Sequence, residues 1–235
     1  MKYLLAFLIL ITTLSTHAEV ITDGTLGQHI NLSGSDFQIT PDLGQQHGGN
    51  LFHSFQNFNL NSSESAIFSG PNSVQNIISR VTGGNPSNID GLIRSTIPNA
   101  DMYFLNPYGI MFGPNAQLDV QGSFHVSTAD YLKLGNEGKF NAHNPNDSLL
   151  TVAPVSAFGF LHDSIATITM QNSILSVGES KSLSLVGGSI EINNTNLSAP
   201  SGQINIVGIS SSNEVKQREN FIDISSFTKL ADIYN

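Results

Sequence analysis

Short segments in which apolar and polar residues alternate recur in the second half of the chain. They run through Ser182–Gly187, Ser189–Ile192 and Gln203–Gly208, and strict alternation over a few residues is the pattern of a half-buried β-strand. Gly, Pro or Asn interrupts nearly every window long enough for a helix. The pattern therefore predicts an all-β chain, in which the best helical candidate, residues 129–134, is only one or two turns long.

One of these segments repeats at a fixed interval. Four positions reappear 21 residues later with the same character: Leu183, Leu185, Val186 and Gly187 return as Ile204, Ile206, Val207 and Gly208. A parallel β-helix has such a repeat, because equivalent side chains of successive coils stack about 4.8 Å apart. Roughly ten coils of this length would use up the chain. On pattern alone, a β-sandwich or an open barrel remains the alternative.

The first residues have the character of an export signal. Lys2 precedes an apolar run from Leu4 to Leu14, and small residues then lead to Ala18. This run is too short to span a bilayer as a helix. We predict a signal peptide over residues 1–18 with cleavage after Ala18, and one domain over residues 19–235. The charged tail from about residue 213 either caps the last coil or begins a continuation of the helix.

Composition narrows the range of partners. The chain has a net charge of −9, and because the predicted leader holds Lys2 and no acidic residue, the mature chain would carry −10. Nucleic acid and anionic membrane surfaces are poor partners for such a chain. It has no cysteine, which suits a protein that crosses a narrow pore unfolded but is also common in exported proteins with large cores.

A series of motifs between residues 50 and 131 carries a family resemblance. In chain order the motifs are Asn50–Phe55, Phe58–Leu60, Ile77–Gly84, Pro86–Gly91, Phe104–Gly113, Gly122–Phe124 and Ser127–Asp130. Together they resemble the secretion, or haemagglutination-activity, domain of filamentous-haemagglutinin-type exoproteins of two-partner secretion systems. The chain departs from that pattern at Tyr108, where relatives commonly carry Asn, and at Ala100-Asp101, which affects transporter specificity more than the fold.

The resemblance implies both a fold and a function. The fold is a right-handed, single-stranded parallel β-helix with short capping and extra-helical β elements. The function is recognition in the periplasm by an outer-membrane TpsB-type β-barrel transporter with periplasmic recognition domains, followed by export to the cell surface or the medium. It also implies an adhesin role toward host-cell or bacterial surface receptors. We expect a monomer that binds no nucleic acid.

Asn106, Pro107, Tyr108, Gly109 and Ile110 form the first candidate site. Pro fixes φ and Gly is free to adopt a positive φ, so this sequence has the chemistry of a β-turn. Two interpretations stay open: the turn is needed only for folding, or it is part of what the transporter recognises.

A second motif surrounds Arg80, which is unusual in a chain with few basic residues. We expect Arg80 to pair with an acid such as Asp90 or to anchor a turn carbonyl. The remaining positions of this motif are expected at tight corners or close backbone contacts; they are Gly83, Gly84, Ser87 and Gly91.

Metal and catalytic chemistry have little support in the sequence. His53 and His125 lie far apart with no second ligand at metal spacing, so no metal and no cofactor are expected. A carbohydrate-active β-helix would need convergent carboxylates, and the candidates are Asp90, Asp101, Asp119 and Asp130. No Asp-Asp pair or basic cluster accompanies them. We expect no enzyme; a carbohydrate-active β-helix or a stand-alone surface-binding module are the alternatives.

Overall fold

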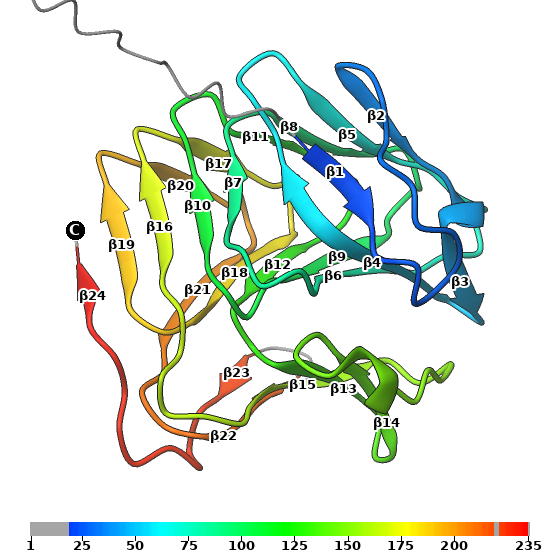
Figure 1. The fold of residues 1–235 in the computed structure, drawn as a ribbon. Helices are drawn as coiled ribbons and strands as arrows, with labels where there is room; N and C mark the ends of the chain where they lie inside the picture. The colour runs from blue at the N-terminus through cyan, green and yellow to red at the C-terminus, as the bar shows by residue number, and fades with distance from the viewer. Residues whose placement is uncertain (1–18, 219–220, 235) are drawn as a thin grey trace, which may run out of the picture.

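A computed structural model describes residues 19–218 and 221–234, which fold into a β-solenoid of about seven turns with a second, smaller sheet beside it (Figure 1). The expected all-β, parallel β-helical architecture is confirmed. The predicted signal peptide lies outside the described residues. Within the described part of the chain, no helix is both long and apolar enough to cross a membrane.

Each complete coil contributes one strand to each of three sides. Sheet A contains β4 (Asn50–Asn59), β6 (Asn76–Val81), β9 (Asp101–Leu105), β12 (Phe124–Ser127), β18 (Ser182–Gly187) and β21 (Gln203–Gly208), paired in parallel. Sheet B contains β2 (Asp36–Ile39), β5 (Ser65–Phe68), β8 (Leu92–Ser95) and β11 (Gln117–Asp119), and the pair β17 (Ile174–Ser176) and β20 (Asn196–Ser198) follows it. Sheet C contains β7 (Ser87–Ile89), β10 (Ile110–Phe112), β16 (Ile168–Gln171), β19 (Ile190–Asn193) and β24 (Ile233–Tyr234).

The repeat seen in the sequence is the register of the last two rungs of sheet A. Leu183 lies opposite Ile204, and Gly187 lies opposite Gly208, so the 21-residue interval is confirmed. Other coils are longer: Asn50 lies opposite Asn76, 26 residues on, and Asn76 opposite Asp101, 25 residues on. The estimate of roughly ten coils was therefore wrong, because it took the shortest coil as typical and allowed nothing for segments outside the solenoid.

A continuous ladder of apolar side chains fills the solenoid behind sheet A. Its fully buried rungs, each opposite the next, are Leu51, Ile77, Met102, Phe124 and Leu183. Burying each such side chain contributes about 1.5–3 kcal/mol. Ile204, on the last rung of sheet A that the structure describes, is 42% exposed. Stacking of coils is thus the source of the core.

An antiparallel sheet, here called the outer sheet, packs on the outside of sheet A (Figure 1). Its strands, in spatial order, are β14 (Gly138–Asn141), β13 (Tyr131–Leu134), β15 (Val155–Phe160), β22 (Asn213–Gln217) and β23 (Ile222–Asp223). The first three come from an insertion between β12 and β16, whereas the last two come from the charged tail. The tail therefore adds strands to the outer sheet and, through β24, to sheet C.

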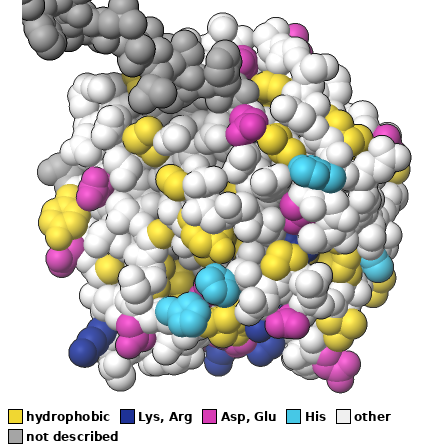
Figure 2. All heavy atoms as spheres, viewed as in Figure 1, with side chains coloured by type: hydrophobic (Ala, Val, Ile, Leu, Met, Phe, Trp, Pro, Cys, Tyr) yellow, Lys and Arg dark blue, Asp and Glu magenta, His cyan; other side chains and the backbone are white. Residues whose placement is uncertain are grey.

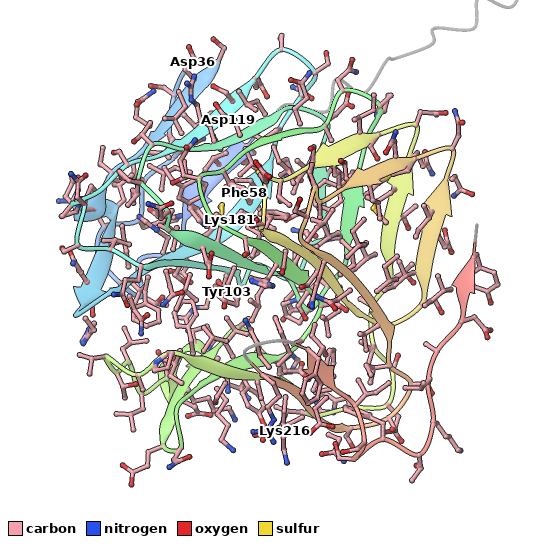
Figure 3. All side chains as sticks on the ribbon, turned by 180° about the vertical axis from the view of Figure 1, so that it is seen from behind. Asp36, Phe58, Tyr103, Asp119, Lys181 and Lys216 are labelled. Carbon is pink, nitrogen blue, oxygen red and sulfur yellow. The ribbon has the colours of Figure 1, made fainter. Side chains whose placement is uncertain are left out.

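The helical candidate at residues 129–134 was wrong, because Tyr131–Leu134 is strand β13. Leu132 and Leu134 are both fully buried, while Tyr131 and Lys133 between them are partly exposed. This period of two places both leucines in an apolar layer with Phe52 and Tyr103 of sheet A. Figure 3 shows Tyr103 between the two sheets. Packing on sheet A, rather than local propensity, decides the conformation.

Short elements complete the N-terminal half. β1 (Glu19–Thr22) and β3 (Gly44–His47) pair antiparallel with β4 and so cap the N-terminal edge of sheet A. Two single-turn 3-10 helices, Pro41–Leu43 and Pro145–Asp147, start at proline. These strands and the outer sheet are the capping and extra-helical elements that the resemblance implied.

Two histidines are fully enclosed in the fold. Burial lowers the pKa of His53 to about 4, although a hydrogen bond to the Thr40 carbonyl and the nearby Asp42 charge oppose the shift. Burial also lowers the pKa of His125 to about 4, and its Nδ1 lies 3.0 Å from Ser184 Oγ. Both imidazoles are therefore neutral structural groups in the folded domain at neutral pH.

We expect the free energy of unfolding to fall as the pH drops from about 7 to about 4. In the unfolded chain His53 and His125 take up protons near the ordinary pKa of 6.5, but in the folded domain they stay neutral until about pH 4. Protons therefore favour the unfolded state throughout this window. Each histidine accounts for at most roughly 3 kcal/mol. Urea unfolding at a series of pH values measures the slope.

Two histidine variants test whether the buried histidines cause this pH dependence of the free energy of unfolding. His125→Asn should remove a large part of the slope, whereas the exposed His162→Asn should leave it unchanged. Burial raises the pKa of Asp101, which acts in the opposite direction but equally in all the variants. A slope that is equally steep in His125→Asn would contradict the assignment.

Candidate functional site

The first candidate motif is the turn that carries the chain from sheet A to sheet C. Gly109 N donates to Asn106 O at 3.2 Å, and Tyr108 N donates to Asn106 Oδ1 at 3.0 Å. Gly109 has a φ of +117°, a conformation that side chains with a Cβ rarely adopt. These contacts explain why Asn comes first and Gly fourth in this turn.

The Asn106 side chain also joins neighbouring coils. Its Nδ2 donates to Asn85 O and to Ser87 Oγ, each at 3.0 Å, in the preceding coil. Its backbone N donates to Ser127 O at 3.0 Å in the following coil. Asn106 and Ser87 are both fully buried. Two residues of the candidate motifs thus hold three coils together and offer no surface to a partner of the folded domain.

The exposed part of the turn contacts the outer sheet. Pro107 and Tyr108 are partly exposed, and the Tyr108 ring stacks on His143 with centroids 6.3 Å apart. His143 in turn lies edge-on to His162 at 5.4 Å, and its Nδ1 lies 3.8 Å from Asp130 Oδ1. Neither histidine could be assigned to this site from the sequence, because only the docking of the outer sheet brings them to the turn.

The glycines of the second motif allow close contact between coils. A Cβ at Gly83 would overlap the carbonyl oxygen of Gln56, and a Cβ at Gly91 would overlap that of Glu64. Gly84 has a φ of +86° with open space around it. These positions are the tight corners and close backbone contacts that we expected. Their part in transporter recognition stays a prediction.

Arg80 lies at the junction of three parts of the fold and is fully buried. Its Nε donates to Ser54 Oγ of β4 at 2.7 Å, and its Nη2 donates to Thr25 Oγ1 near the N-terminal strand at 2.9 Å. Its Nη1 donates to Asn141 O at 2.6 Å and Ser148 Oγ at 2.7 Å in the outer sheet region. The proposed pairing with Asp90 was wrong, whereas the alternative, a carbonyl anchor, is what the structure shows.

The charge of Arg80 is balanced through intermediaries. Its guanidinium lies over the Phe140 ring at 4.2 Å. Ser54 Oγ, which accepts from Arg80, donates to Asp23 Oδ2 at 2.5 Å, and Thr82 Oγ1 donates to the same oxygen at 2.8 Å. Burial lowers the pKa of Arg80 to about 10, opposed by the Asp23 charge. Burial alone would raise the pKa of Asp23, but hydrogen bonds from Ser54, from Thr25 and from Thr82 bring it below its ordinary value. Both groups stay charged at neutral pH.

The four predicted carboxylates are each held by a different neighbour. Asp90 accepts from Asn115 N and Nδ2, Asp101 accepts from Ser123 N, and Asp130 accepts from Leu161 N, whereas Asp119 forms an ion pair with Arg94 Nε at 3.0 Å. They belong to different strands and turns of the solenoid. Among the residues that the structure describes, no three His, Cys, Asp or Glu side chains are grouped so that they could hold a metal ion.

These features place the chain in the class of parallel β-helix domains that carry an added antiparallel sheet. The TPS secretion domain family matches residues 18–232, and the chain belongs to this family. It is thus the N-terminal type of domain found in two-partner secretion exoproteins.

One relative is the Heme/hemopexin-binding protein of Haemophilus influenzae. It is 28% identical over 89 residues, which cover 38% of this chain and 9% of that protein. The chain spans about a tenth of the length of this relative, so the likeness concerns one segment and not the whole protein.

Replacing Arg80 should cost much more stability than replacing an exposed arginine. Arg80→Lys keeps the charge but loses the planar set of donors that reaches four partners, and we expect about 2–4 kcal/mol of destabilisation in urea unfolding. The matched control is Arg94→Lys in the half-exposed pair with Asp119, for which less than about 1 kcal/mol is expected. Equal losses in the two variants would show that the buried network contributes little.

Removing the Asn106 side chain should destabilise the folded domain. Asn106→Ala leaves Asn85 O, Ser87 Oγ and Tyr108 N without a partner, and we expect a loss of about 2–4 kcal/mol. Ser87→Ala removes a single contact and should lose about 1 kcal/mol. Thermal or urea unfolding of the purified variants measures both. A fully stable Asn106→Ala domain would show that these hydrogen bonds contribute little to the folded state.

Proposed function

We propose that this domain directs export through an outer-membrane β-barrel transporter. The transporter's periplasmic domains recognise the motifs that contain Asn106 and Ser87 before the chain folds. The main support for this proposal is that Asn106 and Ser87 are fully buried in the folded domain. A partner can contact these side chains only in a chain that is unfolded or partly folded. Membership of the TPS secretion domain family supports the proposal.

An unfolded segment offers two kinds of contact. In the folded domain the backbone groups of β9 pair with β6 and β12 on either side, so that strand has no free edge. Before folding, the same groups are available to extend a sheet of the receptor by strand addition. Side chains beside that strand, including Asn106, then supply specificity.

Folding after export would remove the recognised segment from the transporter. Stacking of one coil buries about four aliphatic side chains, worth roughly 6–12 kcal/mol, but ordering some 20 residues costs at least about 1 kcal/mol each. Apolar burial alone therefore does not drive coil addition. Buried hydrogen bonds such as those of Asn106 are needed as well, which gives the motif one role before folding and another after it.

Export should depend on a partner transporter and on the sequence of the motif around Asn106. We expect the chain to accumulate in the periplasm when the transporter gene is deleted. With the transporter present, Asn106→Ala should lower export more than Ile93→Ala, a core variant on β8 of similar stability cost, about 2–5 kcal/mol. Quantitative immunoblots of medium and periplasm measure both, and urea unfolding confirms that the two variants are matched.

The outcomes separate recognition from folding. If both variants lose export equally, the loss is explained by reduced stability, and the transporter does not recognise the Asn106 side chain. If export is unaffected by deletion of the transporter, the proposal fails entirely.

An adhesin or other surface-binding role is the second candidate function. The relative described above is named for binding haem and hemopexin, which says only that a protein carrying such a segment can bind ligands. A specific observation in favour of ligand binding by this chain is a groove on its own surface.

A further inference from the structure

A groove of about 490 Å³ runs along the corner where sheet C turns toward sheet B, across four successive coils. Two rows of residues line it. The first row contains Asn59, at the end of β4, and the outward positions Asn88 and Met111 of sheet C. The second row contains the corner residues Asn61, Asp90 and Gly113, and Gln171 at the end of β16. Leu60, Ile89 and Pro114 complete an apolar floor.

The hollow depends on a glycine. A Cβ at Gly113 would overlap the carboxylate of Asp90 from the preceding coil, so a side chain at this corner would fill the groove. Asn115 donates to Asp90 from its backbone N at 2.8 Å and from its Nδ2 at 3.0 Å. The wall is therefore fixed by contacts within the protein, and the cavity is preformed.

Strand addition is not available to a ligand here, because the neighbouring backbone groups are already paired. Asn88 N donates to Asn59 Oδ1 at 2.9 Å, and Asn88 O accepts from Leu60 N at 2.9 Å. Asp90 N donates to Leu60 O, and Gly113 N donates to Ile89 O. An extended polypeptide would find no ladder of donors and acceptors, so recognition must use side chains.

The groove has little charge. No Lys, Arg or His is among the described residues that line it, and its one carboxylate, Asp90, already accepts two hydrogen bonds. Figure 2 shows the basic side chains on this view of the molecule gathered along its lower part. Anionic ligands such as phosphates and sulfated or sialylated sugars thus have no partner here.

The available groups are carboxamides above an apolar floor. Within the described chain, the side chains of Asn88 and Gln171 make no hydrogen bond to another residue. Each carboxamide offers two donor hydrogens and an acceptor oxygen, which matches a hydroxyl group that both donates and accepts. Met111, 37% exposed, supplies an apolar surface between them.

We propose that this groove binds a neutral, hydroxyl-rich glycan, with Asn88 and Gln171 as the hydrogen-bonding residues and Met111 against the apolar face of a sugar ring. Asn88 belongs to β7 and Gln171 to β16, and Met111 of β10 lies in the coil between them, so the groove suits an oligomer better than a single sugar. The site is independent of export, so its loss and the loss of secretion are separate outcomes.

The test uses the folded, secreted chain and an array of neutral hexose and N-acetylhexosamine oligomers, with sialylated and sulfated glycans beside them. We expect retention of neutral glycans only. In titration calorimetry with the best neutral oligomer, Asn88→Ala and Gln171→Ala should each weaken binding about two- to tenfold. Gln117→Ala on β11, an exposed carboxamide of another face, is the matched control and should bind as the wild type does.

Fold and export of the variants are checked in parallel. All three replace exposed side chains and should keep the thermal midpoint within about 2 °C and wild-type secretion. Failure of every neutral glycan to bind, preference for acidic glycans, or equal affinity of Asn88→Ala, Gln171→Ala and Gln117→Ala would overturn the proposal.

Discussion

The burial of one positive charge is the constraint on which the arrangement of this domain depends. Arg80 is removed from solvent inside a β-solenoid, and a buried guanidinium is tolerated only when its donors are satisfied. Its partners come from the N-terminal segment at Thr25, from β4 at Ser54, and from the outer sheet region at Asn141 and Ser148. If any one of these parts is displaced, a charged donor is left unpaired. The network therefore makes the three parts interdependent in a way that coil stacking alone does not.

The sequence was most informative where structure is local and repeated. Leu183 and Ile204 mark the same rung of adjacent coils, so a fixed interval in the chain translates directly into a parallel register. The outer sheet has no such signal. Leu132 and Leu134 alternate over too short a segment to be told from a helical turn, and their partners lie far away in the chain. The hydrogen bonds of Asn50 with Thr151 and Ala153 join the solenoid to the outer sheet, and they form only once both have folded. The sequence pattern therefore did not show that this segment lies outside the solenoid, so the number of coils and the helical candidate were predicted wrongly.

In the candidate site, too, local contacts could be predicted from the sequence and contacts between distant segments could not. Turn chemistry predicts the roles of Asn106 and Gly109, because both act within a few residues. The partners of Arg80, the stack of Tyr108 on His143 and the hollow above Gly113 depend on which coil or insertion lies alongside. A family resemblance locates important residues along the chain, but it does not distinguish those that face a partner from those that close the interior. For Asn106, burial makes that distinction.

The outer sheet also changes how the domain would respond to a pulling force. A bare solenoid holds each coil only by its neighbours, so tension at one end peels coils away in succession. Here the insertion between β12 and β16 contacts β4, pairs through β15 with β22, and binds the loop after β1 through Arg80. The first coils and the strands β22 and β23 of the tail are thus connected through one sheet that lies across the coils. Separating them by force would have to break that sheet, which predicts a single rupture at high force in place of a series of small steps.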